Sequence, residues 1–140
     1  MTVIDGSNLV LGRASSILAK RPLKGERIQI VNAEAMVVTG TKQNVMEKLD
    51  KRREGTVKGN PHKGPKYPRM PERIVKRSVR GMLPWKKPKG KAAFKNLRVY
   101  ISVPSNLIDV KAEKIDGAVN RLEKGFLTVG DISRNLGAKW

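Results

Sequence analysis

The chain has 140 residues, with 30 Lys and Arg against 12 Asp and Glu, which gives a formal net charge of +18 and a length that suits one domain over 1–140. The absence of cysteine excludes a disulfide scaffold, and a single histidine leaves almost no ligands for a Cys/His zinc site. The first residues do not form a signal peptide and no apolar run is long enough to span a bilayer, so we expect a soluble, intracellular protein with a polyanionic partner and no membrane association.

The first 50 residues alternate strand and helix patterns. The apolar periodicity predicts a short strand at 2–5, a helix at 11–20 that Pro22 and Gly25 close, and strands at 27–32 and 36–39. A further helix is expected from Thr41, a good N-cap, to Gly55, with Val45, Met46 and Leu49 facing inward. This order with short connections predicts an α/β fold with a small, mainly parallel sheet covered by helices.

The basic excess lies in the middle of the chain. Residues 51–95 contain sixteen Lys and Arg and two acids, a net charge of +14. Such a dense charge repels itself, and it becomes favourable when phosphates neutralise it and release counterions. A short basic run is ordinarily a solvated surface, but this concentration indicates a nucleic-acid-binding insertion over about 51–95.

Two basic loops and one amphipathic helix make up this insertion. Residues 55–70 mix Gly and Pro with bases, and predict a loop that is ordered by what it binds. Residues 71–83 predict a helix that starts at Pro71, with a basic stripe on one side and Val75, Val79, Met82 and Leu83 on the other. Pro84 ends this helix, and a second basic loop is expected at 84–91.

The aromatic residues and the histidine of the two loops allow more than one interpretation. Tyr67 and Trp85 either stack on a base or ribose, or anchor their loops to the core. Because His62 lies among Pro, Gly and Lys, a phosphate or base contact suits it better than a role as general base.

The rest of the chain is less basic. A short helix at 92–95 leads into the strongest strand pattern, 97–103, which Pro104 terminates. We expect a peripheral C-terminal segment over about 105–140, which contains a capped short helix in 128–137 that ends at Gly137.

The sequence contains no recognisable catalytic constellation. Neither standard glycine-rich phosphate fingerprint is present, and the acidic residues are scattered rather than paired. One alternative is a DNA-binding protein that uses Thr128–Gly137 as half of a helix-turn-helix, but this segment lies outside the basic region. The other is a nucleotide-using enzyme, which only fold analogy suggests.

Several motifs resemble one known family. The run Ser-Val-Arg-Gly-Met-Leu-Pro at 78–84 and the segments Leu-Arg-Val-Tyr at 97–100 and Asn-Pro-His-Lys-Gly-Pro at 60–65 are similar to ribosomal protein thirteen of the large subunit, in its archaeal and eukaryotic branch and in particular its archaeal version. The resemblance covers essentially the whole chain. It implies a three-layer α/β/α domain with a four-stranded, mainly parallel sheet, and no enzymatic activity, cofactor, metal or small-molecule substrate.

The resemblance also implies a structural role in the cytoplasm, in the large ribosomal subunit, with large-subunit ribosomal RNA and neighbouring ribosomal proteins as partners. Phosphate contacts should supply most of the affinity, and recognition should depend on RNA shape rather than on a base code. The residues expected to contact RNA are Lys51, Arg52, Arg53, Lys58, His62, Lys63, Lys66, Tyr67, Arg69, Arg73, Lys76, Arg77, Arg80, Trp85, Lys86, Lys87, Lys89 and Lys91.

Overall fold

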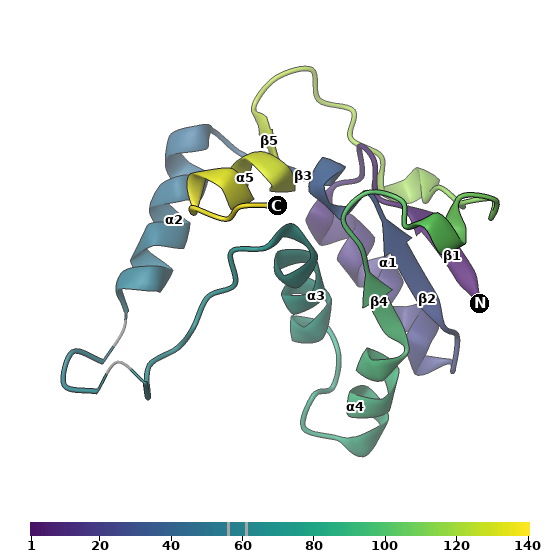
Figure 1. The fold of residues 1–140 in the computed structure, drawn as a ribbon, viewed down its shortest axis with the longest axis horizontal. Helices are drawn as coiled ribbons and strands as arrows, with labels where there is room; N and C mark the ends of the chain where they lie inside the picture. The colour runs from purple at the N-terminus through teal and green to yellow at the C-terminus, as the bar shows by residue number, and fades with distance from the viewer. Residues whose placement is uncertain (56, 61) are drawn as a thin grey trace.

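A computed structural model describes residues 1–55, 57–60 and 62–140 (Figure 1). Pro61, which the sequence analysis places in the first basic loop and in a family-like motif, lies outside the described residues, as does Thr56. The elements are β1 (Thr2–Asp5), α1 (Leu11–Leu23), β2 (Ile28–Val31), β3 (Val37–Thr39), α2 (Lys42–Glu54), α3 (Pro71–Gly81), α4 (Pro88–Lys95), β4 (Leu97–Val99), β5 (Phe126–Thr128) and α5 (Val129–Asn135), with 3-10 turns at Ala33–Ala35, Ser105–Leu107 and Asp116–Ala118.

The centre of the fold is a parallel sheet in the order β1-β2-β4, which confirms the mixed α/β class and the mainly parallel sheet. Its register places Ile4 beside Ile30, and Ile30 beside Val99. These side chains are buried in one cluster with residues of α1 and α3, such as Leu18 and Val75. Helix α1 also packs on α3 and α4, so the three helices share a core with this face of the sheet.

The opposite face of the sheet is covered by irregular chain. Val3 and Val31 point away from the helical side and pack with Leu107, which lies in a 3-10 turn. At the free edge of β1, the Glu113 amide donates to the carbonyl of Val3 and the Asp5 amide donates to the carbonyl of Glu113. The sheet therefore has three strands and a one-residue bridge at its edge, where the family resemblance implies four strands.

The strand β3 does not join the parallel sheet, and this differs from the sequence prediction for 36–39. It pairs antiparallel with β5, which sequence analysis missed. The short β5 leads directly into α5, and Val129 and Ile132 of α5 and the following Leu136 are buried in the main core. The segment 105–140 was expected to be peripheral, but its end is part of the core. The reason is that β5 pairs with β3 and the residues after β5 pack against the apolar side chains there.

Two boundaries near β4 also differ from prediction. The strand ends at Val99 rather than Val103, because the chain turns at Ser102, which has a φ of 56° and donates its amide to the Glu34 carboxylate. Helix α4 begins at Pro88 rather than at 92, so the second basic loop is shorter than expected.

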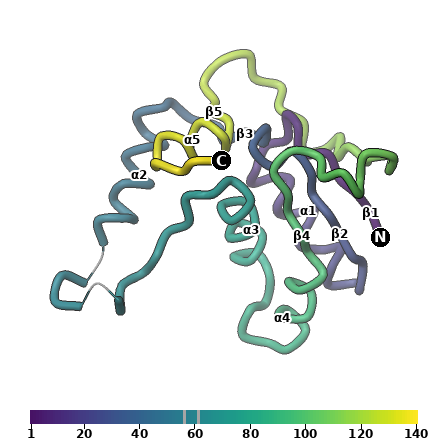
Figure 2. Tube along the Cα trace, viewed as in Figure 1, coloured from purple at the N-terminus to yellow at the C-terminus, as the bar shows by residue number. Residues whose placement is uncertain are grey.

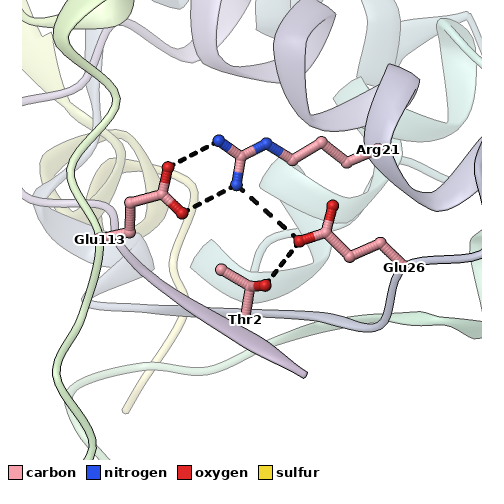
Figure 3. Close-up of polar contacts among 4 residues, drawn as sticks. All are labelled: Thr2, Arg21, Glu26 and Glu113. Carbon is pink, nitrogen blue, oxygen red and sulfur yellow. Dashed lines mark hydrogen bonds and ion pairs between the residues drawn. The ribbon is translucent and has the colours of Figure 1, made fainter.

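The β1 edge is held by a small ion network (Figure 3). The Arg21 guanidinium donates to both carboxylate oxygens of Glu113, at 3.0 and 2.7 Å. Glu26 lies 4.0 Å from the same guanidinium and accepts a hydrogen bond from the Thr2 hydroxyl. This network is separate from the basic middle of the chain. Among the described residues, the helices are too short or too polar to cross a membrane.

Candidate nucleic-acid interface

The basic residues of the middle third lie on four consecutive pieces of structure. These are the end of α2, the loop that joins α2 to α3, helix α3 itself, and the turn and helix that follow it. The loop leaves the body of the protein beyond the end of α2 and returns to the start of α3 (Figure 2). Lys89 and Lys91, which were predicted to lie in a loop, are on α4.

Helix α3 separates its apolar and basic residues as predicted. Pro71 occupies its first turn, and Ile74, Val75 and Val79 are buried against the core. The basic stripe, which we define as Arg73, Lys76, Arg77 and Arg80, lies on the other side, with Arg73 and Arg80 exposed and the other two half-buried. Met82 was expected on the apolar side but is 44% exposed, because the helix ends at Gly81.

Three cations of the basic stripe lie over aromatic rings. The guanidinium carbon of Arg77 is 4.6 Å from the ring centroid of Tyr67, and that of Arg80 is 5.2 Å from Trp85. The ammonium of Lys76 is 5.1 Å from the ring of Phe94 on α4. Cations over ring faces are attracted by the ring quadrupole. The aromatic residues therefore orient the stripe. One of these aromatic residues, Phe94, was not predicted from the sequence to be part of the site.

Tyr67 fastens the first basic loop to the helices on either side. Its ring packs against the core, its hydroxyl accepts a hydrogen bond from Arg52 at 3.3 Å, and Arg77 donates to the neighbouring carbonyl of Lys66 at 2.7 Å. At the end of this loop, the buried Ser133 donates to the carbonyl of Arg69 at 2.6 Å. The position of Tyr67 fits the anchoring interpretation.

Trp85 also anchors its loop, although part of it stays accessible. Its ring meets Phe94 edge to face, with centroids 5.0 Å apart. The side chain is 40% exposed. The ring thus fixes the turn that carries Lys86 and Lys87, while part of the side chain stays at the surface.

The outer part of the first loop is a turn that exposes its basic side chains. The side chain of Asn60 accepts from the His62 amide at 3.1 Å, and the carbonyl of Asn60 accepts from the Lys63 amide at the same distance. The side chains of Lys58, His62 and Lys63 are exposed, and the outer part of the loop lies away from α3 (Figure 1). The structure therefore brings together the stripe and the aromatic residues, while the loop tip remains apart from them.

The basic surface has few internal counterions. Among the predicted site residues in the described ranges, Lys51, Arg53 and Arg73 have an acidic partner within 4.0 Å, namely Glu47, Asp50 and Glu72. These pairs are exposed and contribute little to stability. The remaining positive charge is available to an external polyanion.

Helix α5 does not have the form of a DNA-reading helix. It contains seven residues, and its apolar side is buried in the core. The basic residue of this helix, Arg134, lies with its guanidinium carbon 5.0 Å from the ring centroid of Trp140. The described residues also contain no cluster of potential metal ligands.

The chain is similar in sequence to one family of ribosomal proteins. The sequence model for the family described as ribosomal protein L13 matches residues 1–106. A protein of Methanocaldococcus jannaschii named large ribosomal subunit protein uL13 is 46% identical to the chain, with full coverage of both sequences. Proteins of the same name from Archaeoglobus fulgidus and Thermoplasma acidophilum are 48% and 45% identical, over 97% and 98% of this chain and 87% and 98% of their own lengths.

Proposed function

The chain belongs to the ribosomal protein L13 family, and we infer that it is a structural constituent of the large ribosomal subunit rather than an enzyme. The full-length similarity to proteins named for that subunit supports this conclusion, and nothing in it supports the DNA-binding alternative. The family resemblance noted in the sequence is thereby confirmed.

We propose that the partner of the basic middle third is large-subunit ribosomal RNA. The observation that carries this proposal is the basic stripe of α3, in which three of the four cations lie over rings from the flanking segments. Oriented cations with few internal counterions suit phosphate contacts, which supply affinity without reading a base sequence. The loop tip with Lys58, His62 and Lys63 would extend these contacts, and neighbouring ribosomal proteins would cover other parts of the surface.

We further propose that the fold is a reduced form of the four-stranded, three-layer domain that the family resemblance implies. The edge bridge at Glu113 supports a fourth strand position next to β1. The packing of Leu107 on Val3 and Val31 supports a third layer made of irregular chain.

The proposed RNA contact can be tested by charge reversal on the stripe. The double variant R77E/R80E should remain folded but lose affinity for large-subunit ribosomal RNA, and it should be absent from large subunits separated on sucrose gradients. The matched control is R27E/R98E, which makes the same charge change at exposed positions near the sheet. Normal assembly of R77E/R80E would remove the stripe from the contact surface.

A further inference from the structure

A cavity of about 700 Å³ lies between α2, α3 and the returning end of the first basic loop. Its floor is apolar and includes Leu49, Ile74 and Ile132, which are buried residues of the main core. Val45 lines it from the outer helix and is half-buried. Helix α2 thus leaves part of the apolar surface of the core uncovered.

The mouth of this cavity is positively charged. Four cations line it, Lys48 and Arg52 from α2, Lys66 from the loop and Arg77 from α3. None of the described lining residues is acidic. Arg52 and Arg77 both approach the ring of Tyr67, at 5.9 and 4.6 Å, so the two guanidinium groups are held beside the opening. Charge complementarity therefore calls for an anionic occupant that also has an apolar part.

Gly81 provides a second, independent observation. It lies in the last turn of α3 and lines the cavity, and a Cβ at this position would meet nothing within 4 Å. Its φ is not positive, so the turn does not require glycine. Glycine destabilises a helix relative to alanine, and packing in the free protein does not explain the presence of Gly81. Bare backbone does permit close approach of a bound group.

We propose that the cavity receives the base of an unpaired RNA nucleotide, whose adjacent phosphates contact Arg52, Lys66 and Arg77. This inference rests on the proposed function, in which RNA is the partner, and adds that one base is taken up. A nucleotide unites a flat, largely apolar ring with a negative charge on each side of it. Proteins that read RNA commonly take splayed-out bases and stack them on aromatic rings or guanidinium planes.

The test uses the full chain, isotope-labelled at Ile, Leu and Val methyl groups, and two probes. The probes are single-stranded hexaadenylate and a hexamer of the same phosphate count that is abasic at its central positions. We expect hexaadenylate to shift the methyl resonances of Val45, Leu49 and Ile74, and to bind several-fold more tightly than the abasic probe. The methyl groups of Ile28 and Leu97, which are buried at the sheet, serve as the internal reference.

Cavity-filling variants then separate the base from the phosphates. In G81L and V45W, the advantage of hexaadenylate over the abasic probe should fall to about one, with affinity for the abasic probe unchanged. The matched control is G12L, since Gly12 is also helical with open space around it but lies outside the cavity lining. Urea unfolding of each variant reports whether it is folded.

The outcomes distinguish this inference from the function on which it rests. Equal affinity of the wild-type chain for the two probes, or an advantage that survives in both G81L and V45W, would overturn the base-binding site while leaving phosphate binding intact. If the wild-type chain bound neither probe and did not bind ribosomal RNA, this result would instead count against RNA as the partner. Cavity methyl shifts produced by an alternating Leu-Glu peptide but not by hexaadenylate would replace the nucleotide by a protein segment.

Discussion

Arg77 on α3 lies with its guanidinium carbon 4.6 Å from the ring centroid of Tyr67, while one of its nitrogen atoms donates to the carbonyl of Lys66. One side chain of the basic stripe thereby holds the preceding loop on its helix. The contact links the two parts of the candidate interface, because a shift of the ring would change both the course of the loop and the direction of the cation.

Replacement of Tyr67 by leucine should therefore weaken RNA binding without changing the charge of the protein. The expected loss is about 0.5–1 kcal/mol, or roughly two- to fivefold in Kd for a ribosomal RNA fragment. Tyr67→Phe keeps the ring and should retain nearly all of the affinity. The salt dependence distinguishes orientation from charge: Arg77→Gln should reduce the slope of log K against log salt by about one, and Tyr67→Leu should leave it unchanged. A reduced slope in Tyr67→Leu would contradict the proposed orienting role.

Substitution of Gly90 should destabilise the protein strongly. A Cβ at this position on α4 would overlap the backbone carbonyl oxygen of Pro84, and neither backbone segment can move aside freely. We expect Gly90→Ala to lower the free energy of unfolding by about 1–3 kcal/mol, measured by urea denaturation. Gly12→Ala is the control, since a Cβ there meets nothing within 4 Å and alanine should stabilise the helix by roughly 0.5–1 kcal/mol. Equal stability of Gly90→Ala and wild type would show that the turn before α4 is not closely packed.

The ion pair at the β1 edge should contribute to stability at neutral pH and lose its effect in acid. The hydrogen bond from Arg21 lowers the pKa of Glu113 below its ordinary 4.5, and this effect exceeds the opposing effect of burial. A carboxylate with a lowered folded-state pKa stabilises the protein above its unfolded pKa, and the contribution disappears as the pH falls through the folded value.

The difference in unfolding free energy between wild type and Glu113→Gln should thus be constant above about pH 5 and shrink below pH 4.5. Because Glu113 is exposed, the difference should be small, about 0.5 kcal/mol. Asp5 will add its own acid dependence to both proteins: burial raises its pKa, but hydrogen bonds from Asn32 and Ser7 outweigh this and lower it. A difference that grows toward low pH would contradict the assigned direction.

The N-terminus of α5 should depend on its capping box. Thr128 accepts a hydrogen bond from the Asp131 amide, and the Asp131 carboxylate accepts one from the Thr128 amide. Thr128→Ala should lower the free energy of unfolding by about 1 kcal/mol in thermal or urea denaturation. Thr41→Ala should cost less, since the Thr41 cap of α2 has a single, longer hydrogen bond and its helix is largely exposed. The reverse order would show that α5 contributes little to the core.

The charge, the helical periodicity and the family motifs are properties of the sequence that hold in any conformation. Net charge over 51–95 does not depend on folding, and the spacing of Arg73, Lys76, Arg77 and Arg80 requires only that the segment be helical. This is why the basic stripe, the cap at Thr41, the capped helix α5 and the family could be predicted.

The tertiary structure decided which strand pairs with which and where the aromatic side chains point. The pattern at 36–39 indicates a buried strand, but its partner lies at 126–128, and no local feature of either segment specifies that pairing. Likewise, the strand after α4 ends at Val99 because of a contact between Ser102 and Glu34, residues distant in the chain. Tyr67 contacts Arg77, and Trp85 contacts Arg80 and Phe94. These contacts join separate elements, so they exist only once the chain is folded.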